Sequence, residues 1–463
     1  MMMSWKSLLL LLGPIAAATA AIPTGNSSLN AWVSSQEDIS FSVMLGNINP
    51  PGTVKGFVAA SLSTAGPDYF YSWVRDSALV SRVVTHKYNT TETGNSTVAG
   101  FLQDYVHFQI NTQTESTVCN CLGEPKFNPD GSSYTGPWGR PQNDGPAERA
   151  STMILIADSF LTQTKNTSYV DNTLKPAIYK DLDYVVNTWS NPCFDLWEEV
   201  NGIHFYTLMV MRRGLLDGAN FATRNGDTSK ASSYSSTASQ IQNKIDSFWS
   251  SSKNYIIVTQ DYQNGVQKPS GLDVSTLIAA NVAGMNDGFY TPGSDKMLAT
   301  AVAIENAMAN LYPLNKNLPS YLGNAIGRYP EDTYNGDGNS QGNPWFLATT
   351  AFSELYYRAL LEWQETGVTV TSISKDFFSK FDPNASAGKK YSPGSNEYAS
   401  LAQNIASAAD RFLSTVNYHR NPNGSLSEEY DRNTGYMTGA RDLTWSHAAF
   451  ITAGLARAGT PSF

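Results

Sequence analysis

Several polar segments of this 463-residue chain combine carboxylates with aromatic side chains and arginine. The densest is the run from Asp195 to Gly202, in which a leucine and a tryptophan precede two adjacent glutamates. Four others share this composition, at residues 69–76, 138–145, 328–334 and 427–432. Aromatic faces pack on the apolar faces of a pyranose ring, while Asp, Glu, Arg and Asn hydrogen-bond its hydroxyls. Any one segment is equally compatible with a salt-bridged loop or helix end, but their joint occurrence indicates a carbohydrate site.

Hydrolysis of a glycosidic bond requires two carboxyl groups, one protonated and one ionised. Glu198 and Glu199 are adjacent and cannot share a role, because neighbouring side chains diverge by about 100° in a helix and face opposite ways in an extended segment. We expect one of them to approach the glycosidic oxygen, while the other binds a hydroxyl or pairs with an arginine. The acid needs a raised pKa, which Leu196 and Trp197 could supply by desolvation.

Other motifs in the chain do not support a competing chemistry. The stretch 338–342 matches the G-x-S-x-G pattern of a serine nucleophile, but the polar, turn-rich residues before it do not form the required apolar strand. A calcium loop opening at Asp337 is also excluded, because Ala348 occupies the position of the required glutamate. The five histidines show neither His-x-His nor His-x-x-x-His spacing, so we expect no metal site.

The charge balance and the N-terminal segment restrict the partners and the location of the chain. A net charge of -9 repels polyphosphates, so we expect no binding to nucleic acid or to an anionic membrane. Lys6 precedes an apolar run at residues 7–17, and Ala18 and Ala20 provide small residues for a cleavage site. This pattern predicts a signal peptide at residues 1–20 and secretion rather than a membrane anchor. We further expect a monomer.

Secretion bears on glycosylation and on the cysteines. Six Asn-x-Ser/Thr sequons are candidate glycan acceptors, at Asn26, Asn89, Asn95, Asn166, Asn384 and Asn423. The three cysteines leave at least one thiol unpaired within the chain. We expect a disulfide between Cys193 and either Cys119 or Cys121, since the compartment is oxidising.

Helical patterns recur along the chain, whereas strand patterns are scarce. Apolar residues at i, i+3/i+4 and i+7/i+8 spacing, as in 401–413, mark buried helical faces. The pattern predicts twelve helices, at residues 28–46, 77–88, 97–112, 145–162, 177–189, 205–220, 232–250, 273–284, 296–311, 344–365, 397–416 and 443–458. No Pro- or Ser-rich linker separates them, so residues 21–463 are expected to form one all-α domain of six helical hairpins.

The chain resembles the fungal glucoamylases, glycoside hydrolase family 15. The motifs that carry the resemblance occur in the family's order between residues 69 and 449, as YFYSWVRDS, WGRPQNDGPA, DLWEEVNG, RYPEDTY followed by GNPWFL, SEEYDR and ARDLTWSHAA. The resemblance implies an (α/α)6 barrel and exo-acting hydrolysis of α-1,4 and, more slowly, α-1,6 glucosidic bonds. Starch, glycogen and maltooligosaccharides would be the substrates and β-D-glucose the product, with no cofactor.

The resemblance also implies roles for individual residues. Glu198 matches the family's general acid and Glu428 its general base. The residues implied in substrate binding are Tyr69, Arg75, Asp76, Trp138, Glu199, Arg328 and Trp445. We expect no starch-binding domain and therefore weak adsorption to raw starch granules. Two alternatives stay open, namely another inverting (α/α)6 glycosidase, trehalase-like or cellulase-like, and a catalytically dead sugar-binding protein.

Overall fold

The computed structural model describes residues 21–461, so the expected signal peptide lies outside the described residues. Within them, twelve helices of nine residues or more coincide with the twelve expected from the sequence. They are α1 (Asn30–Gly46), α2 (Val74–Asn89), α3 (Ser96–Thr112), α4 (Asp144–Gln163), α6 (Lys175–Thr188), α7 (Phe205–Arg224), α8 (Thr228–Asp246), α9 (Ser275–Ala283), α10 (Asp295–Leu311), α11 (Phe346–Thr366), α13 (Asn396–His419) and α14 (Thr444–Arg457). No helix among residues 21–461 is both long and apolar enough to cross a bilayer.

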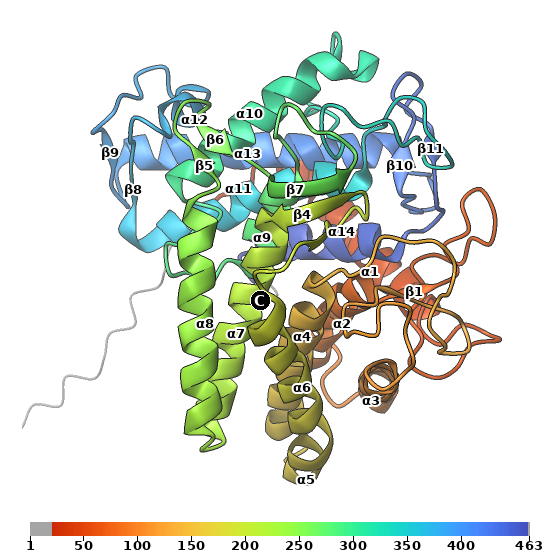
Figure 1. Cartoon of the computed structure of the whole chain (residues 1–463). Helices are drawn as coiled ribbons and strands as arrows, with labels where there is room; N and C mark the ends of the chain where they lie inside the picture. The colour runs from red at the N-terminus through yellow and green to blue at the C-terminus, as the bar shows by residue number, and fades with distance from the viewer. Residues whose placement is uncertain (1–20, 462–463) are drawn as a thin grey trace, which may run out of the picture.

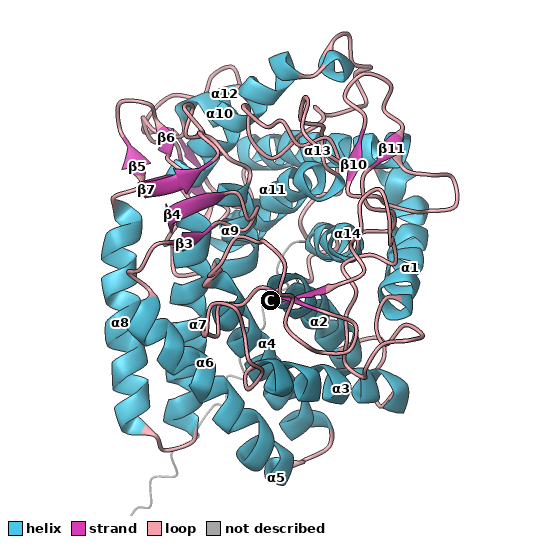
Figure 2. Ribbon diagram, turned by 45° about the vertical axis from the view of Figure 1, so that its right-hand side comes forward, coloured by secondary structure: helices cyan, strands magenta, loops and turns pink. Residues whose placement is uncertain are grey.

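The long helices form two concentric rings (Figures 1 and 2). In the inner ring each helix packs against the next, in the closed order α2, α4, α7, α9, α11, α14 and back to α2. The outer helices α1, α3, α6, α8, α10 and α13 each pack against inner helices, and outer and inner helices alternate along the chain. The expected (α/α)6 barrel of six hairpins is therefore confirmed.

Burial distinguishes the two rings. The inner helix α2 buries 14 of its 16 residues, because neighbouring helices cover it on nearly every side. The outer helix α8 buries only 5 of 19, and these fall on one stripe at helical spacing, at Tyr234, Thr237, Ala238, Ile241 and Ile245. Burial on one stripe thus marks α8 as an outer helix, and burial on nearly every side marks α2 as an inner one.

Short strands stiffen the connections between the helices. Strand β1 (Ser72–Trp73) pairs with β2 (Lys126–Phe127), and β10 (Glu429–Tyr430) with β11 (Met437–Thr438). A three-stranded antiparallel sheet joins β3 (Cys193–Phe194), β4 (Val200–His204) and β7 (Thr259–Gly265). The other short elements are β5 (Trp249–Ser250), β6 (Tyr255–Ile256), β8 (Val368–Thr369), β9 (Lys390–Tyr391), α5 (Thr167–Tyr169), α12 (Lys375–Ser379) and single helical turns at Ser27–Leu29, Val170–Leu174 and Pro313–Asn315.

The expected disulfide of Cys193 is wrong. Cys119 and Cys121 bond to each other instead, with their Cα atoms 5.1 Å apart across a tight turn at Asn120. Cys193 lies in β3, where it is 3% exposed and keeps a free thiol. Burial raises the pKa of this thiol to about 12. The turn at Asn120 brings Cys119 and Cys121 together, while the sheet that contains β3 buries Cys193 away from them.

Candidate active site

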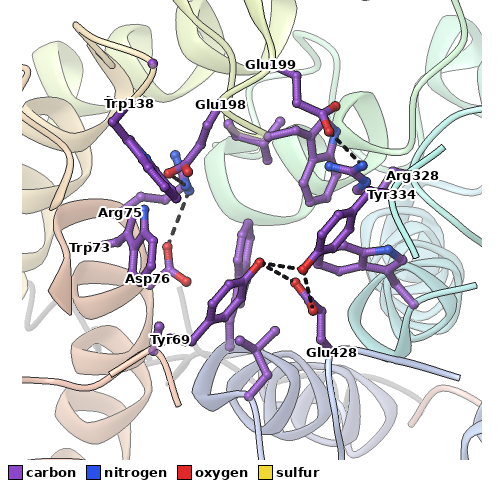
Figure 3. A pocket seen from close by; sticks show the side chains of 17 residues that line it. Tyr69, Trp73, Arg75, Asp76, Trp138, Glu198, Glu199, Arg328, Tyr334 and Glu428 are labelled. Atoms are coloured by element: carbon purple, nitrogen blue, oxygen red, sulfur yellow. Dashed lines mark hydrogen bonds and ion pairs between the residues drawn. The ribbon is translucent and has the colours of Figure 1, made fainter. Parts of the chain in front are cut away.

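A pocket of about 290 Å³ opens at the end of the barrel where the inner helices begin. Its lining residues lie in the first turns of inner helices or in the connections that lead into these helices, so the barrel fixes segments that are far apart in sequence around one cavity (Figure 3). All nine residues proposed from the sequence line it, namely Tyr69, Arg75, Asp76, Trp138, Glu198, Glu199, Arg328, Glu428 and Trp445. The structure therefore brings the whole predicted set together, whatever the role of each member.

Glu198 lies in the turn between β3 and β4. Its backbone amide donates to the Asp195 carbonyl over 2.9 Å, and its φ of 68° falls in the left-handed region that favours glycine. The Asp195 carboxylate closes the turn by accepting from the amides of Glu199 (2.8 Å) and Val200 (3.0 Å). A strained backbone that the surroundings hold in place is typical of functional positions, because it aims one side chain where a relaxed turn would not.

The adjacent glutamates point to different sides of the pocket, as expected (Figure 3). The Glu198 carboxyl lies 3.4 Å from Nη2 of Arg75, whereas Glu199 accepts from Nη2 of Arg328 over 2.8 Å. The Tyr329 hydroxyl donates to the other Glu199 oxygen over 2.6 Å. Glu199 is thus held by two short hydrogen bonds, while Glu198 is contacted by Arg75 over 3.4 Å and by Gln142, and lines the cavity.

Burial sets the protonation of Glu198. Desolvation raises its pKa to about 7, against the opposing effect of the nearby Arg75. Arg75 is itself engaged by Asp144 (3.0 Å), Gln142 (3.0 Å) and Asp76 (3.5 Å), so its charge is shared among several acceptors. A carboxyl group kept protonated near neutral pH can donate a proton.

Glu428 lies on the opposite side of the pocket, just before β10 (Figure 3). One carboxylate oxygen accepts from the Tyr69 hydroxyl over 2.8 Å, and the other accepts from Tyr334 over 3.2 Å and from the Ala440 amide over 3.3 Å. Burial raises the pKa of Glu428, and these three donors oppose the rise because they stabilise the ionised form.

Glu429, next in the chain, is fully buried and competes with Glu428 for one negative charge. It accepts from Asn343 over 2.9 Å, and its second oxygen has no hydrogen-bond partner among the described residues. Burial raises the pKa of Glu429 well above its usual value, and the neighbouring Glu428 raises it further. Since Glu428 has three donors and Glu429 has one, Glu428 carries the charge and Glu429 holds the proton.

Replacing Glu429 by Gln is expected to change kcat/KM for maltose by less than about threefold, which is under about 1 kcal/mol in the barrier. The amide has the same charge and nearly the same shape as the protonated acid that it replaces. A pH profile of kcat/KM measures this directly. A large loss of activity, or a shift of the acidic limb, would show that Glu429 is ionised in the native protein.

A buried ion cluster supports the turn that carries Glu198. Lys268 lies 3.0 Å from Asp195 and 2.8 Å from Asp273, and all three side chains are at most 4% exposed. Asp273 also accepts from the indole N–H of Trp197 over 2.9 Å. Burial alone lowers the pKa of Lys268, but the two carboxylates raise it above its usual range. The lysine is therefore charged and ties the turn to the start of α9.

Replacing Lys268 by Met is expected to lower the free energy of unfolding by about 3–5 kcal/mol, because it leaves two buried carboxylates without a cation. Lys230→Met is the matched control. Lys230 pairs with Asp183 over 2.7 Å at the surface, where such pairs contribute about 0–1 kcal/mol. Denaturant titration of both variants measures the difference, and equal losses would contradict the prediction.

Aromatic side chains form much of the remaining wall. Tyr69, Trp138 and Trp445 were predicted from the sequence, whereas Trp73, Tyr334 and Trp345, which also line the pocket, were not. Each missed residue lies inside a motif that had been recognised, so the signal was present. Hydrophobic Leu196, Trp197 and Leu443 also line the pocket. These apolar groups exclude water from the carboxyls and provide faces for a sugar ring.

The site offers one carboxyl group that can donate a proton and another that can accept one. Among residues 21–461 there is no cluster of three or more His, Cys, Asp or Glu side chains that could hold a metal ion. Two carboxyl groups lie on opposite sides of a small pocket, one with its pKa raised by burial to about 7 and the other accepting three hydrogen bonds that favour its ionised form. This arrangement suits the hydrolysis of a glycosidic bond.

Comparison with known proteins agrees with this geometry. Residues 39–455 match the model of glycosyl hydrolases family 15. The chain is 67% identical over 450 residues to glucoamylase 1 of Rhizopus oryzae, covering 97% of this chain and 74% of that protein. It is 35% identical to a probable glucoamylase of Schizosaccharomyces pombe, covering 96% of each chain.

Solved structures give the same result. The family 15 glucoamylase of Hypocrea jecorina superposes with a TM-score of 0.86 at 36% identity, over 94% of this chain and 73% of that one. A glucoamylase of Saccharomycopsis fibuligera superposes with a TM-score of 0.86 at 32% identity, over 95% and 98% of the two chains. The similarity therefore extends through the barrel and its loops.

Proposed function

The chain belongs to glycosyl hydrolases family 15, and from this premise we propose that it is an exo-acting, inverting glucoamylase. It hydrolyses terminal α-1,4 and, more slowly, α-1,6 glucosidic bonds of starch, glycogen and maltooligosaccharides. The observation that carries the proposal is the pair of carboxyls on opposite sides of one pocket, Glu198 with 16% of its side chain exposed and Glu428 fully buried. A small pocket also suits cleavage at a chain end better than a long open cleft would.

In the proposed reaction Glu198 donates its proton to the glycosidic oxygen while the bond from that oxygen to C1 breaks. Positive charge then develops at C1 and the ring oxygen. Glu428 removes a proton from a water molecule that attacks C1 from the opposite face, so the α-linkage yields β-D-glucose. Glu198 ends as a carboxylate and Glu428 as a carboxylic acid, and exchange of one proton with solvent restores both.

The other groups bind and orient the sugar. Arg75 and Asp76, joined over 3.5 Å in the first turn of α2, are placed to hold the hydroxyls of the terminal glucose. Arg328 and Glu199 form a second polar pair on the far side of the pocket. Tyr69, Trp138 and Trp445 supply ring faces. None of these roles requires a metal or an organic cofactor.

We propose also that the enzyme is secreted and monomeric. A secreted monomer that acts on neutral polymeric glucans has no need of nucleic acid or a membrane. Five of the six sequon asparagines are exposed and Asn95 is partly so, which suits glycan attachment.

Proton NMR of maltose hydrolysis tests the proposal. The α- and β-anomers of glucose have separate anomeric signals, so the first-formed product can be identified before it equilibrates. We expect β-glucose to appear first. First-formed α-glucose would contradict inversion, and an absence of glucose from maltose and starch would favour another glycosidase or a sugar-binding protein.

A further inference from the structure

Beside Glu198 the wall of the pocket contains a closed aromatic box. Its four sides are Tyr71, Trp73, Trp138 and Tyr134, and each ring contacts the next, with centroid separations of 5.4–6.1 Å. The Lys126 ammonium occupies the centre, 3.7 Å from the Trp138 ring and 4.0, 4.2 and 4.7 Å from Tyr71, Tyr134 and Trp73. Boxes of this kind bind quaternary ammonium ligands in other proteins. Here the occupant is part of the chain.

The backbone holds Lys126 in this place from two directions. Lys126 pairs with Trp73 across the β1–β2 ladder, and its carbonyl accepts from the Tyr134 amide over 3.0 Å. The lysine and two sides of the box are thus fixed relative to each other. Trp138 is held less firmly, because its buried indole N–H has no hydrogen-bond partner among the described residues. Packing and the ammonium fix the plane of this ring.

Burial of the Lys126 ammonium costs free energy of folding, so stability does not explain a lysine at this position. It is 3% exposed, and within the described residues its ammonium makes neither an ion pair nor a hydrogen bond. An apolar side chain of the same length would fill the box without the cost of burying a charge. A role in substrate binding explains the charge better, because two of the rings that the ammonium contacts, Trp73 and Trp138, line the pocket.

We propose that Lys126 is a positioning residue, whose ammonium holds the rings of Trp73 and Trp138 as a fixed sugar-binding wall beside Glu198. The proposal rests on the proposed function, because it assigns that wall to the glucan. Each face in contact with the ammonium gains a cation–π interaction that is lost when the ring rotates. Charge on the lysine therefore keeps the wall in one orientation before the sugar arrives.

The lysine also acts on Glu198 through its charge. Burial lowers the pKa of Lys126 to about 8, while Glu198 and Asp68 raise it and Arg140 lowers it further. In return Lys126 lowers the pKa of Glu198. The two tyrosines of the box, Tyr71 and Tyr134, are the remaining titratable groups that face the ammonium. Removing the lysine charge should therefore make Glu198 hold its proton to higher pH.

The test uses Lys126→Met, which keeps the length of the side chain and removes the charge. We expect kcat/KM for maltose to fall at least about tenfold, with no decrease in Tm. The alkaline limb of the pH profile should move to higher pH, whereas Lys126→Arg should leave the limb where it is. Lys253→Met is the control, because this exposed lysine lies 5.6 Å from a single ring, that of Tyr255, away from the pocket.

Three results would overturn the inference. One is a Lys126→Met variant with unchanged kcat/KM, another is a loss of activity with the alkaline limb unmoved, and the third is a fall in Tm or failure to fold. The first two results would show that Lys126 does not position the wall as proposed. The third would show that its role is purely structural. Failure of the proposed function gives a different pattern, since the unmutated protein would then not release β-glucose from maltose.

Discussion

Replacing Glu198 by Gln is expected to lower kcat for maltose by about 10²–10⁴-fold. The amide keeps the shape and the contact with Arg75 but has no proton to give to the leaving oxygen. Maltose binding should be spared, because the other polar pairs of the pocket are intact. Steady-state kinetics gives kcat, and isothermal titration calorimetry of the inactive variant gives the affinity for maltose.

Glu199→Gln is the matched control, since it makes the same change one residue along the chain. Glu199 is held by Arg328 and Tyr329, so its substitution should act mainly on binding and raise KM. The choice between the two glutamates as proton donor is thereby decided. Near-normal kcat in Glu198→Gln, with a collapse of kcat in Glu199→Gln, would reverse the assignment.

The same variant reports the pH dependence of the native protein. Glu198 has a pKa raised to about 7, so it must lose its proton as pH rises through 7, and kcat/KM should fall there. A raised pKa stabilises the fold fully below the unfolded value of 4.5, and this stabilisation is lost as pH rises through 7. Glu198→Gln should therefore lack both the alkaline limb and this loss of stability, which thermal unfolding across the same pH range can measure.

Replacing Glu428 by Gln is expected to cause a loss of kcat of the same order, about 10²–10⁴-fold, for a different reason. The attacking water then has no base to take its proton. The Tyr334 hydroxyl and the Ala440 amide can donate to the amide oxygen, while the amide N–H can donate to the Tyr69 hydroxyl, so the pocket should keep its shape. Rates with maltose at saturating concentration measure the loss.

A small anionic nucleophile distinguishes this role from a general disturbance of the site. Azide needs no deprotonation, so it should restore part of the rate in Glu428→Gln and yield a β-glucosyl azide. Glu198→Gln should show no such rescue with maltose, since its leaving group still lacks a proton. Failure of azide to act on Glu428→Gln, or equal rescue of both variants, would contradict the roles proposed for the two carboxyls.

Most of the fold could be predicted from the sequence, because outer helices show one apolar stripe and inner ones show long buried runs. The start of α2 could not. The pattern placed it at residue 77, whereas the helix begins at Val74 after Trp73, which gives no side-chain cap. The helix therefore starts three residues earlier than predicted. This earlier start places Arg75 and Asp76 in the first turn of α2, where the helix holds them beside the pocket.

The members of the site were predicted from motifs, but the contacts that position them were not. Lys268 binds Asp195 from 73 residues away, and Lys126 lies between aromatic residues on two other segments, 71–73 and 134–138. Neither lysine belongs to a recognised motif, and a lone lysine in a polar stretch carries no signal of burial. The pairing of Cys119 with Cys121 was also missed, because it depends on the local turn rather than on the compartment.

Closure of the inner ring by α14 against α2 makes the barrel depend on contacts between distant parts of the chain. Asn26 and Arg457 meet over 3.0 Å although 431 positions separate them. During synthesis α14 can pack between α2 and α11 only after the chain has been made nearly to residue 457. Until then the apolar faces of α2 and α11 that α14 covers stay exposed. The same closure delivers Trp445 to the pocket last. Because Trp445 lies in α14, the wall of the pocket is complete only when this last helix packs between α2 and α11.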